Sequence, residues 1–123
     1  PYNNRQYPPN YHVLETVAMY DFPELKGVTG QRDYTNKKSL FCNKAKARIV
    51  FEELIKKAQF KHIILSYSTE GIISTEEIIT ILKKYGIPKS LKIYEIPYRR
   101  FKSNQMKSKV ALKEFLFYVE KNI

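Results

Sequence analysis

Residues 62–66, with the sequence HIILS, are the stretch from which the fold can be predicted. A continuous apolar run of this length is typical of a strand that is buried on both faces in a parallel sheet. Ser74, with Glu77 three residues later, matches the capping box that starts a helix. That helix carries a group of large apolar residues, Ile78, Ile79, Ile81 and Leu82. Gly86 and then Pro88 predict where it ends.

Further strands and helices flank this unit on both sides. Residues 91–98 are predicted as a second strand and residues 111–119 as a third. Upstream, helices are predicted from Asn10, as the cap, to about Tyr20, and over residues 43–59. The face of the second helix that is expected to be buried consists of Ala45, Ile49, Val50, Leu54 and Ile55. Residues 1–9 and 21–38 are predicted as loops, in which Gly27 and Gly30 serve loop geometry. Strands that alternate with helices indicate an α/β fold.

The three predicted strands are few for a parallel sheet, and one flank of such a sheet would expose unpaired backbone groups. We therefore expect the chain to be the carboxy-terminal half of a doubly wound sheet. A missing amino-terminal half or another chain would complete that sheet. The sequence starts at Pro1 without an initiator Met, which agrees with a partial domain over residues 1–123.

The charge of the chain points to a polyanionic partner. Lys and Arg total 22 against 12 Asp and Glu, which gives a net charge of +10 and a pI near 9.6. Such a charge favours nucleic acid or an anionic membrane surface as the partner. No stretch approaches the roughly 20 apolar residues of a membrane span. A lone cysteine, Cys42, excludes an internal disulfide and most cysteine-based metal sites. We expect a cytosolic protein without a metal.

Two segments carry residues suited to binding a nucleic acid. Pro1-Tyr2 places an aromatic ring behind a proline, and a loop rich in amides with one arginine follows it. Residues 99–109 hold five basic residues and no acid, and Tyr98 and Phe101 are interleaved with them. Cations in such a loop can contact phosphates while an aromatic ring contacts a base. The alternative is a solvated hairpin. Ser66-Tyr67-Ser68 either contributes to a ligand site at the end of its strand or simply ends the strand.

An ordered set of motifs runs through the chain: Pro1-Tyr2, Arg5-Gln6-Tyr7, Asn10-Tyr11-His12, Leu14-Glu15-Thr16, Thr29-Gly30, Arg32, Phe41-Cys42, Leu65-Ser66-Tyr67-Ser68, Tyr98-Arg99-Arg100-Phe101-Lys102-Ser103 and Leu116-Phe117-Tyr118. This set resembles the Dam-like adenine-specific DNA methyltransferases over nearly the whole length. The resemblance implies a Rossmann-like sheet whose last strand, residues 111–119, is antiparallel. It also implies transfer of a methyl group from S-adenosylmethionine to the 6-amino group of adenine in double-stranded DNA, after the base has flipped out of the duplex.

The resemblance implies roles for individual residues. Pro1-Tyr2 would close an Asp-Pro-Pro-Tyr motif, with Tyr2 stacking on the base and the backbone at Pro1 accepting a hydrogen bond from the amino group. The residues implied in DNA binding are Asn3, Arg5, Gln6, Tyr7, Tyr98, Arg99, Arg100, Lys102 and Ser103. His12 is expected to be structural. Neither a metal nor a membrane is implied, and the location would be the bacterial cytoplasm.

The sequence also departs from that family. The Asp expected before Pro1, the glycine-rich cofactor loop and the target-recognition region are not among these 123 residues. We therefore expect the cofactor-binding residues upstream of Pro1, and we expect the chain alone to transfer no methyl group. Two alternatives remain open. One is a non-enzymatic nucleic-acid-binding module that uses the same loops, and the other is a methyltransferase that acts on RNA or on another base.

Overall fold

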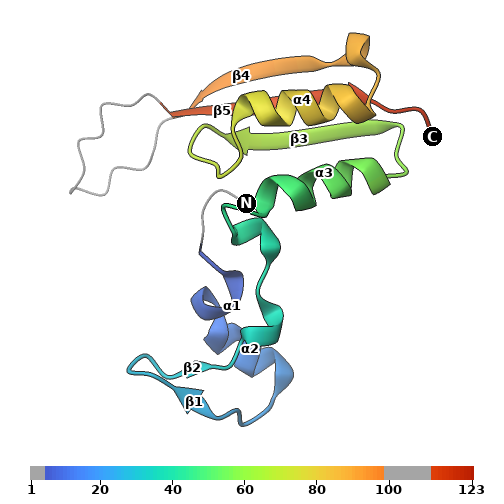
Figure 1. The fold of residues 1–123 in the computed structure, drawn as a ribbon. Coiled ribbons are helices and arrows are strands. Elements are labelled where there is room, and N and C mark those ends of the chain that lie inside the picture. The colour runs from blue at the N-terminus through green and yellow to red at the C-terminus, as the bar shows by residue number, and fades with distance from the viewer. Residues whose placement is uncertain (1–4, 99–111) are drawn as a thin grey trace.

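The core of the fold is a three-stranded sheet. The computed structural model describes residues 5–98 and 112–123. Strand β5 (Leu112–Glu120) lies between β3 (His62–Ser68) and β4 (Lys92–Tyr98) and is antiparallel to both (Figure 1). As a result β3 and β4 run parallel to each other, and helix α4 (Thr75–Tyr85) connects them through the short 3-10 helix η3 (Pro88–Ser90). The predicted antiparallel last strand is confirmed.

The prediction that residues 62–66 are buried on both faces of a parallel sheet is wrong for the described residues. Strand β3 pairs antiparallel with β5, and its side chains alternate between a covered and an open face. Ile64, on the open face, is 67% exposed, whereas Tyr67, on the covered face, is 4% exposed. Among the described residues, helices pack on one face of the sheet only. Every second side chain of the apolar run therefore lies on the open face and stays exposed.

The hydrophobic core joins the covered face of the sheet to helices α3 (Ala47–Lys57) and α4. Its fully or nearly fully buried members are Ala47, Phe51, Ile55, Tyr67, Ile73, Ile78, Ile81, Leu82, Phe117 and Val119. Helix α4 follows its prediction at both ends. The Ser74 hydroxyl accepts from the amide of Glu77 at 3.2 Å, and the Glu77 carboxylate accepts from the amide of Ser74 at 3.0 Å. Tyr85 is the last helical residue before Gly86.

Helix α3 begins later than predicted and turns a different face to the core. Of the five residues predicted to be buried, Ile55 alone is, while Ile49 and Leu54 are 57% and 55% exposed. The turn before the helix explains the difference. The carbonyl of Asn43 accepts from the amides of Lys46 and Ala47 at 3.0 and 2.8 Å and closes a separate turn. The first helical bond runs from the amide of Val50 to the carbonyl of Lys46 at 3.1 Å, so Lys46 is the cap and Ala47 the first helical residue. Ala47, Phe51 and Ile55, spaced four residues apart, then share the buried face.

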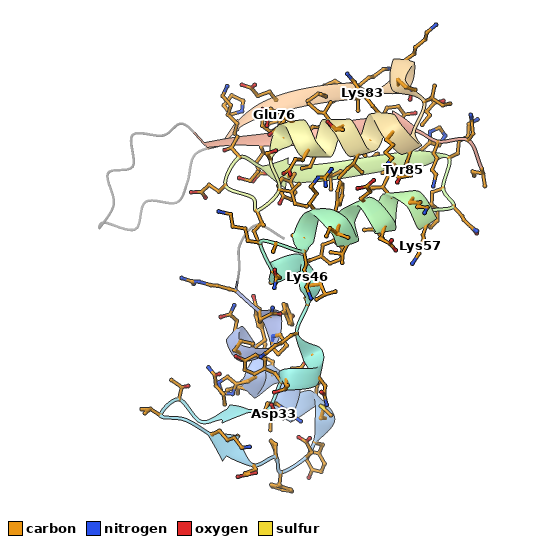
Figure 2. The ribbon with its side chains drawn as sticks, in the orientation of Figure 1. Asp33, Lys46, Lys57, Glu76, Lys83 and Tyr85 are labelled. Atoms are coloured by element: carbon orange, nitrogen blue, oxygen red, sulfur yellow. The ribbon has the colours of Figure 1, made fainter. Side chains whose placement is uncertain are left out.

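Two polar contacts hold α3 in place. Glu52 accepts from Lys84 Nζ at 2.7 Å and from the Tyr85 hydroxyl at 3.0 Å, so it links α3 to α4 (Figure 2 shows Tyr85 between the two helices). These two donors lower the pKa of the Glu52 carboxyl. At the carboxyl end of α3, Lys121 Nζ donates to the carbonyls of Ile55, Lys56 and Ala58 at 2.9, 2.7 and 2.7 Å. The last carbonyls of a helix have no partner within the helix and carry its negative dipole end, so a cation there is stabilising.

The amino-terminal part consists of short elements that lie away from the sheet (Figure 1). These are α1 (Tyr7–Asn10), α2 (His12–Met19), a hairpin of β1 (Leu25–Lys26) and β2 (Gln31–Arg32), and the 3-10 helices η1 (Thr35–Lys37) and η2 (Leu40–Cys42). The helix predicted with Asn10 as its cap starts instead after Tyr11, because Pro8 and Pro9 start a separate turn of helix that ends at Asn10. Gly27 and Gly30 have φ of 73° and 61°, which confirms their role in the loop.

We expect Lys121→Met to lower the free energy of unfolding by about 1 kcal/mol, because it leaves three helix-end carbonyls without their cationic donor. Urea unfolding of the protein measures the change. Lys83→Met, at an exposed position of α4, is the control and should have little effect. Equal stability of the two variants would contradict this role of Lys121.

Candidate nucleic-acid interface

The structure describes three of the predicted site residues in full: Arg5, Gln6 and Tyr7. Pro1, Tyr2 and Asn3 lie outside the described residues, as do Arg99, Arg100, Lys102 and Ser103. Tyr98 is described only through its backbone, as the last residue of β4. The proposed roles of the undescribed residues therefore stay predictions. The residues that adjoin them in the chain define the described part of the candidate site.

Strands β3 and β4 end, and β5 begins, along the same edge of the sheet, the edge formed by the ends of the strands. Tyr98 pairs with Leu112, and Ser68 pairs with Glu114, so the end of β4, the end of β3 and the start of β5 are neighbours. The amide of Thr69 donates to the carbonyl of Lys113 at 3.1 Å and ties the loop after β3 to β5. In open α/β sheets, ligands bind outside the carboxyl ends of the strands, which makes this edge the candidate site.

Both long helices begin near this edge. Helix α4 follows β3 directly, and Arg48 Nε near the start of α3 pairs with Glu77 Oε1 near the start of α4 at 3.4 Å. Arg5 lies next to the segment that leads into α3, since its carbonyl accepts from Cys42 Sγ at 3.3 Å. The predicted loop at residues 5–7 and the flanks of residues 99–111 are therefore at the same end of the molecule.

Tyr67, considered from the sequence as a possible site residue, belongs to the core. Its hydroxyl accepts from the amide of Ile73 at 3.0 Å, and its ring leaves no room at Gly71, where a Cβ atom would lie 2.0 Å from Cε1. Neighbouring Ser68 accepts from the amide of Glu70 at 3.2 Å. This geometry favours the structural interpretation for Tyr67. The close approach of Gly71 has no signal in the sequence pattern.

Gln6 makes a reciprocal pair of hydrogen bonds with the backbone of Ser39. Its Nε2 donates to the Ser39 carbonyl at 3.1 Å, and its Oε1 accepts from the Ser39 amide at 2.7 Å. The two residues are 33 positions apart, so no local pattern reveals the pair. We call this pair of bonds the Gln6–Ser39 clasp.

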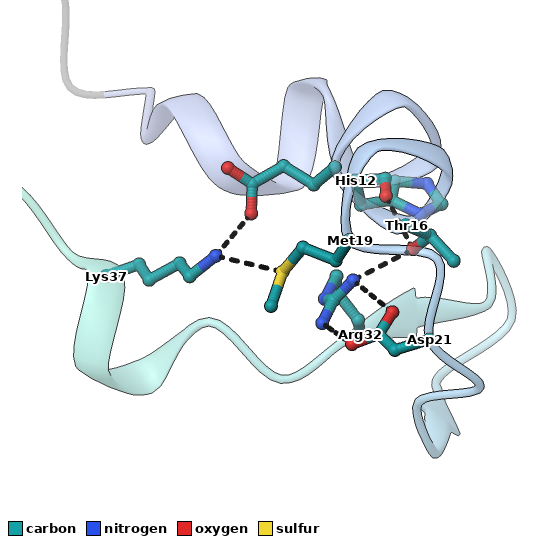
Figure 3. Close-up of polar contacts among 7 residues, drawn as sticks. His12, Thr16, Met19, Asp21, Arg32 and Lys37 are labelled. Carbon is teal, nitrogen blue, oxygen red and sulfur yellow. Dashed lines mark hydrogen bonds and ion pairs between the residues drawn. The ribbon is translucent and has the colours of Figure 1, made fainter.

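Tyr7 lies at an open cavity of about 250 Å³ on the amino-terminal part. The cavity is lined by Tyr7, Tyr11, Leu14, Glu15, Ala18, Met19 and Lys37. The rings of Tyr7 and Tyr11 stack with centroids 4.3 Å apart, and Tyr7 is 63% exposed. Lys37 Nζ contacts Glu15 Oε2 at 2.6 Å and Met19 Sδ at 3.7 Å (Figure 3). Tyr7 is therefore exposed enough to contact a ligand, while Glu15, the only carboxylate among the lining residues, is already paired with Lys37.

Arg32 holds the hairpin against α2 through a network that sequence reasoning missed (Figure 3). Its two terminal nitrogens bind the two carboxylate oxygens of Asp21 at 3.0 and 2.7 Å, and Nη1 also donates to the Thr16 hydroxyl at 3.2 Å. The Thr16 hydroxyl in turn donates to the His12 carbonyl at 2.8 Å. The Arg32 guanidinium lowers the pKa of Asp21, and Asp21 raises the pKa of Arg32.

Residues 5–98 and 112–123 contain no group of three or more His, Cys, Asp or Glu side chains that could hold a metal ion. Within the same ranges no helix has the length and apolar character needed to cross a bilayer.

Comparisons with known proteins give a consistent family. Residues 1–81 match the family model for D12 class N6 adenine-specific DNA methyltransferases. The chain is 50% identical over 123 residues to the type II methyltransferase M.FokI of Planomicrobium okeanokoites, covering all of this chain and 19% of that protein. It is 43% identical over 121 residues to the modification methylase StsI of Streptococcus sanguinis, covering 98% of this chain and 18% of that protein. The modification methylase LlaI of Lactococcus lactis is 35% identical over 126 residues, covering all of this chain and 20% of that protein.

The chain thus spans about a fifth of the length of these three relatives. A search of solved structures gave no significant match.

We expect Asp21→Asn to weaken the dependence of stability on acid. A carboxyl whose pKa is lower in the folded state stabilises the fold above its unfolded pKa, and this contribution is lost as the pH falls through the folded pKa. For Asp21 that loss lies below the ordinary aspartate value of about 3.9. Melting temperatures measured from pH 7 to pH 2 should fall less steeply for Asp21→Asn, which is also the less stable protein at pH 7.

The control for this prediction is Glu24→Gln, because Glu24 is an exposed carboxylate with only a 3.9 Å contact to Lys26. Its melting curve should follow that of the unaltered protein. Parallel curves for all three proteins would contradict a folded-state role of the Asp21–Arg32 pair.

Proposed function

Because the chain belongs to the D12 class N6 adenine-specific DNA methyltransferases, we propose that the protein containing it methylates the 6-amino group of adenine in double-stranded DNA, with S-adenosylmethionine as donor. The observation that carries the proposal is the family match over residues 1–81, which includes Pro1-Tyr2 and Arg5-Gln6-Tyr7. Relatives named modification methylases support a place in a restriction–modification system.

We propose further that the sheet is the carboxy-terminal half of a Rossmann-like sheet. Support comes from the parallel β3–α4–β4 unit, in which antiparallel β5 is inserted. Among the described residues β3 pairs along one edge only, and the open face carries the exposed side chains of Ile64, Tyr94 and Ile96. A free strand edge and a half-covered sheet favour further strands and helices from residues outside the described ranges, or from another chain.

The proposed roles of the chain's own residues are to hold the base and the DNA. A flipped adenine would stack on Tyr2, and stacking of about 1–3 kcal/mol per base offsets part of the cost of flipping. The backbone at Pro1 would accept a hydrogen bond from the 6-amino group and so orient the nitrogen for in-line attack. Proton loss can follow methyl transfer, so no strong base is required at His12. Asn3, Arg5, Gln6 and Tyr7 would form one DNA-facing loop, and Tyr98, Arg99, Arg100, Lys102 and Ser103 the other.

The described residues do not form a site that fits S-adenosylmethionine. The chain has four glycines, Gly27, Gly30, Gly71 and Gly86, and they do not form a glycine-rich loop. The cavity beside Tyr7 is open, and its carboxylate, Glu15, is bound to Lys37. We therefore propose that the donor is held by residues outside these 123, and we derive no step of the reaction through it.

A direct test is an assay of the longest reading frame that contains the chain. The purified product, incubated with duplex DNA and S-adenosylmethionine, should yield N6-methyladenine that is detected by mass spectrometry of the digested DNA. The 123 residues alone should yield none. DNA binding without any methylation by the long product would refute the proposal and favour the nucleic-acid-binding module. Methylated cytosine or methylated RNA would favour the other alternative.

Within that assay, Tyr2→Ala should lower kcat by roughly 5- to 150-fold, which is the loss of a stacking contact of about 1–3 kcal/mol. Affinity for nonspecific DNA should change little. Phe22→Ala removes an aromatic ring from a fully exposed position and is the matched control. Equal losses of turnover and nonspecific affinity in Tyr2→Ala would indicate misfolding and contradict the stacking role.

Neutralising Arg99, Arg100 and Lys102 together, each to Gln, should flatten the salt dependence of DNA binding. Each lost phosphate contact changes the slope of log K against log salt by about 0.9, so the slope should become shallower by up to about 2.7. The same change at Lys56, Lys57 and Lys61, exposed residues at the end of α3 and just before β3, is the control and should leave the slope unchanged. An unchanged slope in the first variant would argue against phosphate contacts by this segment.

A further inference from the structure

We propose that Gln6 is a positioning residue, which acts through the Gln6–Ser39 clasp to set where Pro1-Tyr2 stands relative to the sheet. This inference rests on the proposed function and specifies how one residue of its first DNA-facing loop works. Gln6 uses both heavy atoms of its amide on the Ser39 backbone, at 3.1 and 2.7 Å. An amide group that is paired in this way is poorly placed to read a base edge with two hydrogen bonds, which is how Gln reads adenine.

The clasp connects the amino-terminal segment to the core through few intervening groups. The Ser39 hydroxyl accepts from the amide of Phe41 at 3.2 Å and so starts η2. Phe41 packs against the core cluster. The amide of Asn43 then closes η2 on the carbonyl of Leu40 at 3.0 Å. Because the carbonyl of Asn43 accepts from Ala47, which is fully buried, the position of Ser39 is fixed by the core.

Arg5, the residue before Gln6, makes a second contact that reinforces the connection between the amino-terminal segment and the core. Cys42 Sγ donates to the Arg5 carbonyl at 3.3 Å, so Arg5 and Gln6 each bind the segment around η2. Pro8 is buried and Pro9 follows it at the start of α1, and proline fixes the backbone φ there. The chain is therefore held at Gln6 and stiff just after it, and only three residues separate Gln6 from Tyr2.

This arrangement suits a residue that must place a reacting group without contacting it. A displacement of about 1 Å in the reacting geometry can cost roughly 100-fold in rate. Losing the clasp would free Gln6 from Ser39 while leaving the core and the other DNA contacts in place. The expected effect therefore falls on the chemical step and not on DNA affinity.

Gln6→Met tests the inference in the full-length protein, since Met matches the length of Gln but makes neither hydrogen bond. The single-turnover rate of methylation should fall by about 10- to 100-fold, while KM for DNA and the melting temperature stay near those of the unaltered protein. Gln59→Met, at an exposed position after α3, is the matched control and should change none of the three.

The opposite side of the clasp gives an independent variant. Ser39→Pro removes the backbone N–H, and the local backbone tolerates proline because Ser39 has φ −82° and Lys38 has ψ 122°. Ser39→Ala removes only the hydroxyl and serves as its reference. Ser39→Pro should be slower than Ser39→Ala by a factor similar to that of Gln6→Met. The double variant Gln6→Met/Ser39→Pro should be little slower than the worse single one, since both break the same contact.

Three results would overturn the inference. A higher KM for DNA at an unchanged rate would make Gln6 a direct DNA contact. A loss of rate in proportion to a fall in melting temperature would show that the clasp only stabilises the fold. No change at all would make it dispensable. Hydrogen exchange at the Ser39 amide, faster in Gln6→Met than in Gln59→Met, tests the clasp without any turnover. If the unaltered protein does not methylate DNA, the proposed function fails, and this exchange measurement still decides whether the clasp exists.

Discussion

The position of β5 between β3 and β4 is the constraint on which the rest of the fold depends. Its backbone supplies the hydrogen-bonding partners of two strands that are parallel to each other and do not pair with one another. Its side chains Phe117 and Val119 are fully buried under α3 and α4. Lys121, the first residue after β5, binds the carbonyls at the carboxyl end of α3 and so holds that helix as well. Removing this one strand would separate the sheet into two unpaired strands and open the core.

The two parts of the described chain differ in how they are held together. Around the sheet, burial of large side chains dominates, and polar contacts such as Glu52 with Lys84 only orient the helices. In the amino-terminal part, α2 has no buried residue, and the network of Arg32 with Asp21 replaces a core. Polar contacts depend on direction more than apolar ones do. That part can therefore hold a defined geometry with little buried surface, as the DNA-facing loop that we propose would require.

The sequence predicts best where short-range chemistry decides the structure. The capping box at Ser74 and the stop at Gly86 define α4, and the predicted third strand, residues 111–119, lies within one residue of β5 at each end. The predicted face of α3 is wrong because a separate turn closed by the Asn43 carbonyl delays the start of the helix to Ala47, and periodicity carries no signal for that turn. The clasp between Gln6 and Ser39 and the contact of Gly71 with Tyr67 join residues through tertiary structure, which a single sequence does not encode as a pattern. The order of the motifs predicts the family, and the match of the family model over residues 1–81 confirms it.

The order of the strands also has a consequence during protein synthesis. Translation yields β3 and β4 before β5, and 43 residues lie between Ser68 and Leu112. At about 5–20 residues per second, β3 waits roughly 2–9 s on the ribosome before its neighbour can emerge. Throughout that interval the strand has an apolar edge without a partner, the kind of segment that chaperones recognise and that nascent chains aggregate through. Codon choice between these strands, which sets the length of this wait, is thus a physical variable of folding for this protein.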